Sequence, residues 1–239
     1  MISLDLGFLG ISGGHLERLL LYKAVLPLNS ELFSWVKGLV QPQILPGATT
    51  IGVVCKDGVI LASEKRVAYG YLVLSKAGKK VFKITENVGA ACAGLMADMQ
   101  VLAKEAAAQM TLYSLESRRP VSVNAVAKLI AVLLFQHRLF PLLTQTVIGG
   151  VDGEGPRIYV LDPLGSVIED KFACVGSGAE IATGVLESEY KEGMSLEEAK
   201  NLVVRSIKAA ISRDVQSGDG ADLLIITSQG AREESIDFK

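Results

Sequence analysis

The sequence has few residues from which a metal or redox centre is usually built. Its 239 residues contain only two histidines and three widely spaced cysteines, Cys55, Cys92 and Cys174. The absence of a CxxC pair and of any cysteine–histidine cluster argues against zinc and iron–sulfur sites, so we expect no metal. A sparse, odd number of cysteines is typical of a reducing compartment, and we expect a cytoplasmic protein.

Excess charge of one sign and long apolar runs are also missing. Lys and Arg together number 24 and Asp and Glu number 26, which argues against a nucleic-acid partner and against a disordered chain. The longest apolar stretch, 121–135, contains Lys128 and is shorter than the roughly 20 residues that a membrane span needs. The first ten residues lack a basic region and contain Asp5, so we expect no secretory signal and no membrane partner.

The first 47 residues differ in pattern from the rest. Segments 15–23 and 30–40 carry apolar residues at helical spacing, and prolines interrupt the region at positions 27, 42 and 46. Two short helices without a sheet cannot form a core of their own. We therefore predict an arm at 1–47, followed by a folded domain at 48–239.

From Ala48 onward the pattern is one of short β-branched strands with helices between them. The predicted strands are 49–55, 59–63, 72–74, 80–84, 88–93, 145–151, 157–161, 167–174 and 221–227. Helices are predicted at 98–113 and 121–138, and a capping box at 195–198 opens another. Because strands and helices are clustered rather than alternating, they favour an α+β fold with two antiparallel sheets between helices, a four-layer αββα sandwich.

Seven short motifs follow one another along this domain. They are Gly47-Ala48-Thr49-Thr50, the hairpin Lys56-Asp57-Gly58, Glu64 before Lys65-Arg66, Gly78-Lys79-Lys80, Ala93-Gly94 with Asp98, Gly176-Ser177-Gly178, and Arg213-Asp214 with Ser217-Gly218. Glu64 lies sixteen positions after Ala48, and Lys80 lies thirty-two after it. Each motif is weak alone. In this order and spacing they resemble the β subunits of the proteasome, most closely the archaeal kind, from Gly47 to about Thr227.

The resemblance implies the N-terminal-nucleophile hydrolase fold and a threonine endopeptidase that cleaves its own propeptide. The cleavage would follow Gly47, so that 1–47 would be the propeptide. Lys80 would depress the pKa of the nucleophile, Glu64 would hold Lys80, and Gly94 would offer its N–H group to the oxyanion. A hydrogen-bonding shell around the terminal amine is implied for Ser177, Asp214 and Ser217. An apolar specificity pocket is implied for Val67, Cys92 and Met96.

The position of the nucleophile departs from the family, because it holds Ala48 where a threonine is expected. Thr49 does not fit the same role, since a shift of one residue along a strand turns the side chain to the opposite face. A methyl group cannot attack a carbonyl, so we predict an inactive, unprocessed precursor. Ala48 is either an introduced residue that traps the precursor, which the intact remainder of the site favours, or the natural residue of a structural subunit that scaffolds the ring. A different N-terminal-nucleophile hydrolase is disfavoured, because the match extends through both central helices.

The resemblance also implies partners but no cofactor. These partners are other β subunits in a seven-fold ring, α subunits, and a regulatory unfoldase cap that delivers protein substrates for ATP-dependent degradation. The apolar residues of the 1–47 arm suggest an assembly aid that binds neighbouring subunits until cleavage removes it.

Overall fold

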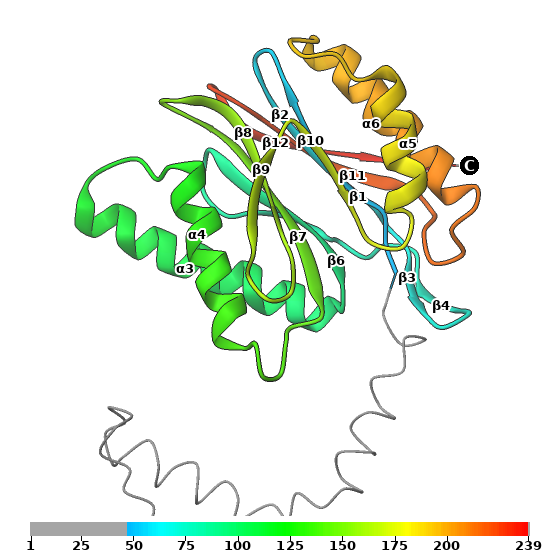
Figure 1. The fold of residues 1–239 in the computed structure, drawn as a ribbon, viewed down its shortest axis with the longest axis horizontal. Helices are drawn as coiled ribbons and strands as arrows, with labels where there is room; N and C mark the ends of the chain where they lie inside the picture. Colours follow the sequence, from blue (N-terminus) through cyan, green and yellow to red (C-terminus); the bar gives the residue numbers. More distant parts are fainter. Residues whose placement is uncertain (1–46, 239) are drawn as a thin grey trace, which may run out of the picture. The chain divides into compact units, whose positions relative to one another are not determined.

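Two five-stranded antiparallel sheets form the centre of the fold (Figure 1). The computed structural model describes residues 47–238, so the predicted arm helices at 15–23 and 30–40 lie outside the described residues. The first sheet has the order β10 (Phe172–Val175), β1 (Thr50–Cys55), β2 (Gly58–Glu64), β11 (Ala221–Thr227) and β12 (Gly230–Ile236). The second has the order β5 (Val81–Lys83), β6 (Val88–Gly94), β7 (Thr144–Asp152), β8 (Gly155–Leu161) and β9 (Val167–Asp170). A small hairpin, β3 (Val67–Tyr69) and β4 (Leu72–Ser75), stands apart from both sheets.

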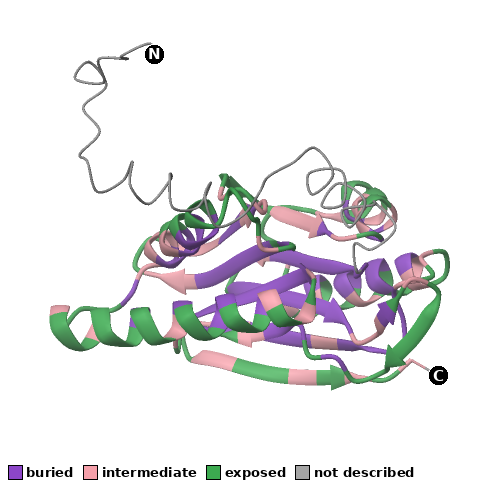
Figure 2. Cartoon of the chain, turned by 90° about the horizontal axis from the view of Figure 1, so that it is seen from below, coloured by how far each residue is buried: buried purple, intermediate pink, exposed green. Residues whose placement is uncertain are grey.

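Helices cover the outer face of each sheet and complete four layers. Helices α3 (Met96–Ser117) and α4 (Val123–Gln136) share one apolar core with the second sheet. Helices α5 (Ala179–Glu189) and α6 (Leu196–Ile211) share another with the first sheet. A third core lies between the two sheets, and the buried strands of this interior are visible in Figure 2. The predicted αββα sandwich is therefore confirmed.

Alternation along β1 decides which side chains face which layer. The hairpin predicted at Lys56-Asp57-Gly58 pairs Cys55 with Gly58 and sets the register of β1 against β2. Ile51 and Val53 belong to the core beneath α5 and α6. Gly52 faces the other sheet, since a Cβ there would lie 2.5 Å from Val147 Cγ1. Even-numbered positions of β1 thus point between the sheets, and odd-numbered positions point toward the helices.

The boundaries of several elements differ from the sequence prediction. The predicted strand 167–174 is two strands, β9 and β10, which lie in different sheets and are separated at Lys171. Strands β3 and β12 and helix α5 were not assigned from the sequence. Helix α4 is shorter than the predicted 121–138, and Val132 and Phe135 on its outer face are 52% and 55% exposed. The capping box predicted for α6 is present, with Ser195 and Glu198 bonded reciprocally.

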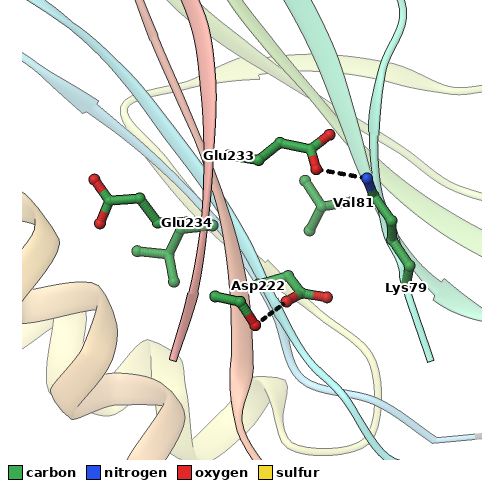
Figure 3. Close-up of a pocket in the computed structure, with 7 residues that line it drawn as sticks. Lys79, Val81, Asp222, Glu233 and Glu234 are labelled. Carbon is green, nitrogen blue, oxygen red and sulfur yellow. Dashed lines mark hydrogen bonds and ion pairs between the residues drawn. The ribbon is translucent and has the colours of Figure 1, made fainter. Parts of the chain in front are cut away.

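An ion pair links edge strand β12 of the first sheet to the segment that precedes edge strand β5 of the second. Lys79, which precedes β5, lies 2.6 Å from the Glu233 carboxylate on β12 (Figure 3). The pair borders a hollow of about 190 Å³ lined by Lys79, Val81, Asp222, Leu223, Glu233, Glu234 and Ser235. Both charged side chains are half exposed, so the pair is of the weakly stabilising surface kind.

Residues 47–238 lack two features that would suggest another kind of protein. No helix there is long and apolar enough to cross a membrane. No group of three histidine, cysteine, aspartate or glutamate side chains is arranged to hold a metal ion.

Burial of the cysteines leads to a testable prediction. Burial raises the pKa of both the Cys92 and Cys174 thiols to about 11 from the ordinary 9.0. Only the thiolate reacts, so a pKa raised from 9.0 to about 11 lowers the fraction of thiolate about a hundredfold near neutral pH. We expect iodoacetamide to alkylate both residues at least that much more slowly in the native protein than in guanidinium, as measured by mass spectrometry. Equal rates in both states would contradict the burial.

Candidate active site

A buried ion pair lies where β2 ends and β5 begins. Glu64 is the last residue of β2 and Lys80 directly precedes β5, and their side chains are 0% and 2% exposed. Lys80 Nζ donates to Glu64 Oε1, to the Glu64 carbonyl at 3.1 Å and to the Arg66 carbonyl at 2.6 Å. These three acceptors use all three N–H groups of the ammonium. Burial lowers the pKa of Lys80 and raises the pKa of Glu64, because each charge has left water, and the attraction between them acts in the opposite direction.

The second carboxylate oxygen of Glu64 connects β2 to the segment 214–220. Glu64 Oε2 accepts from the Arg66 N–H at 2.7 Å and from the Gly218 N–H at 3.0 Å. The Arg66 guanidinium binds Asp219 Oδ2 at 2.9 Å through Nε and the Val215 carbonyl at 2.9 Å through Nη1. It also occupies the space beside Gly218 that a side chain would fill. The ion pair and this segment are therefore held in a fixed relation.

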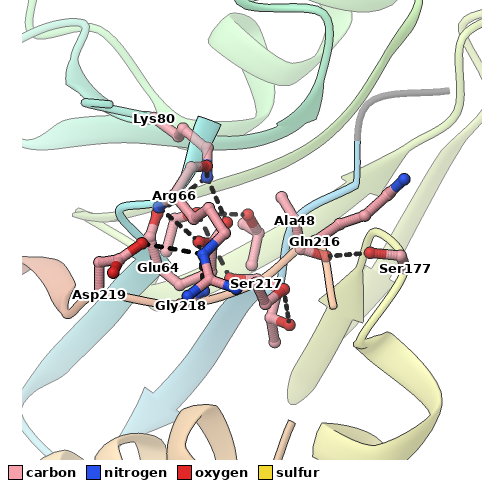
Figure 4. Close-up of polar contacts among 12 residues, drawn as sticks. Ala48, Glu64, Arg66, Lys80, Ser177, Gln216, Ser217, Gly218 and Asp219 are labelled. Carbon is pink, nitrogen blue, oxygen red and sulfur yellow. Dashed lines mark hydrogen bonds and ion pairs between the residues drawn. The ribbon is translucent and has the colours of Figure 1, made fainter. Parts of the chain in front are cut away.

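Asp214 organises a second polar group, and its partners Ser177 and Ser217 are labelled in Figure 4. It follows the end of α6, and its Oδ2 accepts from Ser177 Oγ and from Ser217 Oγ, each at 2.6 Å. Ser217 Oγ in turn lies 2.8 Å from Thr49 Oγ1. A chain of hydrogen bonds thus joins the start of α5, the loop after α6 and the residue before β1.

Ala48 and Thr49 point to opposite sides at the start of β1. Ala48 is fully buried in the core between the sheets, and its carbonyl accepts from Gly178 N at 3.2 Å and from Ser177 Oγ at 3.4 Å. The Thr49 hydroxyl bonds Ser217 and fills the space that a Cβ of Gly178 would occupy. The bonds of Lys80 Nζ within residues 47–238 go to Glu64 and Arg66 and not to Thr49. Thr49 is therefore positioned as a structural hydroxyl.

The structure brings together five of the predicted site residues through direct contacts. Glu64 and Lys80 form the ion pair. Ser177, Asp214 and Ser217 form a hydrogen-bonded cluster around Ala48 and Thr49. Gly47 lies beside Ser177 and Gln216. The chemical roles assigned to all of these residues stay predictions.

The remaining predicted residues are Gly94, assigned to the oxyanion, and the three residues assigned to the pocket. Gly94 ends β6 with φ +141°, next to Ala93, which belongs to the same core as Ala48. Val67 and Met96 are half-buried, whereas Cys92 is fully buried against Thr146. The oxyanion role of Gly94 and the predicted pocket stay predictions.

Sequence reasoning missed Arg66, Gln216 and Asp219 as parts of this region. The Arg66–Asp219 contact joins positions 153 residues apart, which spacing alone cannot reveal. The glycine pair Gly218 and Gly220 around Asp219 was the available signal, since such a segment often passes close to another group.

The αββα sandwich is the fold of the N-terminal-nucleophile hydrolases. In this chain a buried lysine–carboxylate pair lies beside the start of its first strand. A profile of the proteasome subunit family matches residues 44–226. The chain therefore belongs to the proteasome subunit family, a family of threonine proteases, as a β subunit of the archaeal kind.

Three archaeal relatives illustrate this similarity. Proteasome subunit beta 2 of Caldivirga maquilingensis is 47% identical over 196 residues, which cover 82% of this chain and 98% of the relative. Proteasome subunit beta 1 of Ignicoccus hospitalis is 50% identical over 185 residues, 77% of this chain and 93% of the relative. Proteasome subunit beta 1 of Cenarchaeum symbiosum is 51% identical over 189 residues, 79% of this chain and 97% of the relative. Membership in this family implies assembly with other proteasome subunits.

Proposed function

We propose that this chain is a catalytically inactive, unprocessed β subunit of a proteasome core particle. The observation that carries the proposal is the position of Ala48, whose methyl lies buried between the sheets while the surrounding polar groups are assembled. Peptide cleavage by a threonine protease needs a hydroxyl at that position, and a methyl group has no lone pair with which to attack.

The polar groups around Ala48 support the chemistry that a threonine there would perform. Its hydroxyl oxygen would attack the Gly47 carbonyl carbon, and the bond between residues 47 and 48 would break as the leaving amine takes up the hydroxyl proton. Water would then hydrolyse the ester that joins Gly47 to the hydroxyl oxygen. Lys80 would assist loss of the hydroxyl proton, and Glu64 would hold Lys80 in place. Ser177, Asp214 and Ser217 would then surround the released amine, and residues 1–47 would leave as a propeptide.

A naturally structural subunit is the second candidate, and one observation favours it. The three donors of Lys80 are all satisfied by Glu64 and Arg66, with no contribution from residue 48. The ammonium of Lys80 is thus fully hydrogen-bonded without a nucleophile at position 48. Such an arrangement suits a subunit that only scaffolds the ring. In either case the chain would assemble with other β subunits, α subunits and an unfoldase cap. This assembly would carry out ATP-dependent protein degradation in the cytoplasm.

Restoring the nucleophile distinguishes the two candidates. In Ala48→Thr, expressed with its α-subunit partners, we expect loss of residues 1–47 and a new amino terminus at residue 48, detected by mass spectrometry. We also expect cleavage of a fluorogenic peptide to rise from background by several orders of magnitude, because the reaction gains its nucleophile.

Ala48→Val is the matched control for this experiment. Valine has nearly the shape of threonine but no hydroxyl, so it tests whether extra volume alone disturbs the core between the sheets. It should fold, remain unprocessed and stay inactive. Silence of a folded Ala48→Thr variant would reject the trapped precursor and leave the structural subunit.

A further inference from the structure

The residue before Ala48 lies in a gap too narrow for a side chain. Gly47 is buried, and a Cβ built on it would lie 2.0 Å from Gln216 Oε1, 2.3 Å from Ser177 Oγ and 2.5 Å from Gln216 Cβ. Real carbon atoms do not approach neighbours this closely. Rotation of side chains moves the first two atoms, whereas Gln216 Cβ moves only with its backbone.

Both walls of the gap are anchored to Asp214. The Gln216 N–H donates to Asp214 Oδ1 at 3.1 Å, and Ser177 Oγ donates to Asp214 Oδ2 at 2.6 Å. The residue before Gln216 is held in addition, because the Val215 carbonyl accepts from Arg66 Nη1 at 2.9 Å. Backbone movement that would widen the gap therefore disrupts several hydrogen bonds at once.

The gap is also coupled to the position of the peptide that follows it. The Ala48 carbonyl accepts from the Gly178 N–H at 3.2 Å, next to Ser177. A side chain at position 47 that pushed the chain away from Gln216 would stretch this bond. The width of the gap thus controls the placement of the bond between residues 47 and 48.

We infer that Gln216 and Ser177 form a two-sided clamp that admits only glycine at position 47 and so positions the 47–48 peptide bond. Gln216 is a positioning residue that determines specificity for the size of the residue before the cleavage point. This inference deepens the proposed function, since the clamped bond is the one that a nucleophile at position 48 would cut.

The first test uses the chain with its own Ala48 and needs no cleavage. Hydrogen exchange of the Gly178 amide reports the bond to the Ala48 carbonyl. Gly47→Ala should speed this exchange at least about tenfold, because overpacking at a rigid wall displaces the chain. Adding Gln216→Gly, which removes the Cβ, should restore most of the protection, whereas adding Gln216→Ala, which keeps it, should restore less.

The second test introduces the same substitutions into Ala48→Thr and follows loss of residues 1–47. Gly47→Ala should slow processing at least about tenfold, and Gln216→Gly should recover it. Gly184→Ala in α5 is the control, since a Cβ there meets nothing within 4 Å and should change neither readout.

The two tests separate this inference from the proposed function. If Ala48→Thr is never processed, the proposed latent cleavage is wrong, and hydrogen exchange alone decides on the clamp. Unchanged exchange in Gly47→Ala, or equal rescue by Gln216→Ala and Gln216→Gly, overturns the clamp whatever the processing result.

Discussion

Replacing Lys80 with methionine is expected to lower the free energy of unfolding by about 3–5 kcal/mol. The substitution keeps a similar side-chain length but leaves the fully buried Glu64 carboxylate without its cation. It also removes the donor to the carbonyls of Glu64 and Arg66, and unsatisfied buried acceptors add to the cost. Urea denaturation of the two proteins measures the difference.

The pH dependence of this loss identifies Glu64 as its origin. Burial raises the pKa of Glu64 above 4.5, and without Lys80 no ammonium opposes that rise. The folded variant therefore binds a proton that the unfolded chain releases, so folding gains stability as the pH falls through the raised pKa toward 4.5. The deficit of Lys80→Met should be largest above the raised pKa and should shrink as the pH falls from there toward 4.5.

The neighbouring lysine supplies a matched control. Lys79 pairs with Glu233, but both side chains are 52% exposed. Lys79→Met should therefore cost less than about 1 kcal/mol and show no comparable recovery in acid. A cost for Lys80→Met no greater than that for Lys79→Met would show that the buried pair contributes little to stability.

The fold could be predicted wherever a local signal was strong. The two-residue turn after Cys55, the apolar run 221–227 and the capping box of α6 each carry their own signature, and each is present. Helix α5 begins after Gly178 without a side-chain cap, so its start has no such signature. The break at Lys171 has neither glycine nor proline, and only the pairing of β9 with β8 and β10 with β1 creates it.

The candidate site shows the same division between local and long-range information. Strand periodicity predicts that Thr49 turns away from Lys80, and the structure places its hydroxyl on Ser217. The packing of Cys92 against Thr146 and beneath α3 joins segments that no spacing in the sequence brings together. Likewise, the Glu64–Gly218 bond joins positions 154 residues apart and follows only from the pairing of β2 with β11.

Gly94→Ala is expected to be the most damaging of the glycine substitutions around the site. Gly94 has φ +141°, and a Cβ there would lie 2.0 Å from the Leu143 carbonyl oxygen and 2.9 Å from its carbon. Both atoms belong to backbone that cannot rotate away, and the same carbonyl accepts from Leu95 N at 2.7 Å. Unfavourable backbone torsion alone costs about 1–3 kcal/mol, so with the clash we expect a loss of about 3 kcal/mol or more in urea denaturation.

Gly155→Ala separates the two contributions to this loss. Gly155 has φ +103° in the turn between β7 and β8, but a Cβ there meets nothing within 4 Å, so the variant carries torsional strain without a clash. In the Ala48→Thr background, Gly155→Ala should leave the rate of peptide cleavage unchanged. Gly94→Ala should abolish it, because the N–H group predicted to bind the oxyanion would move with the end of β6. Equal loss of stability in both variants would show that the backbone at Leu143 shifts to accommodate the new Cβ. Peptide cleavage by both variants would show that the predicted oxyanion role of Gly94 is wrong.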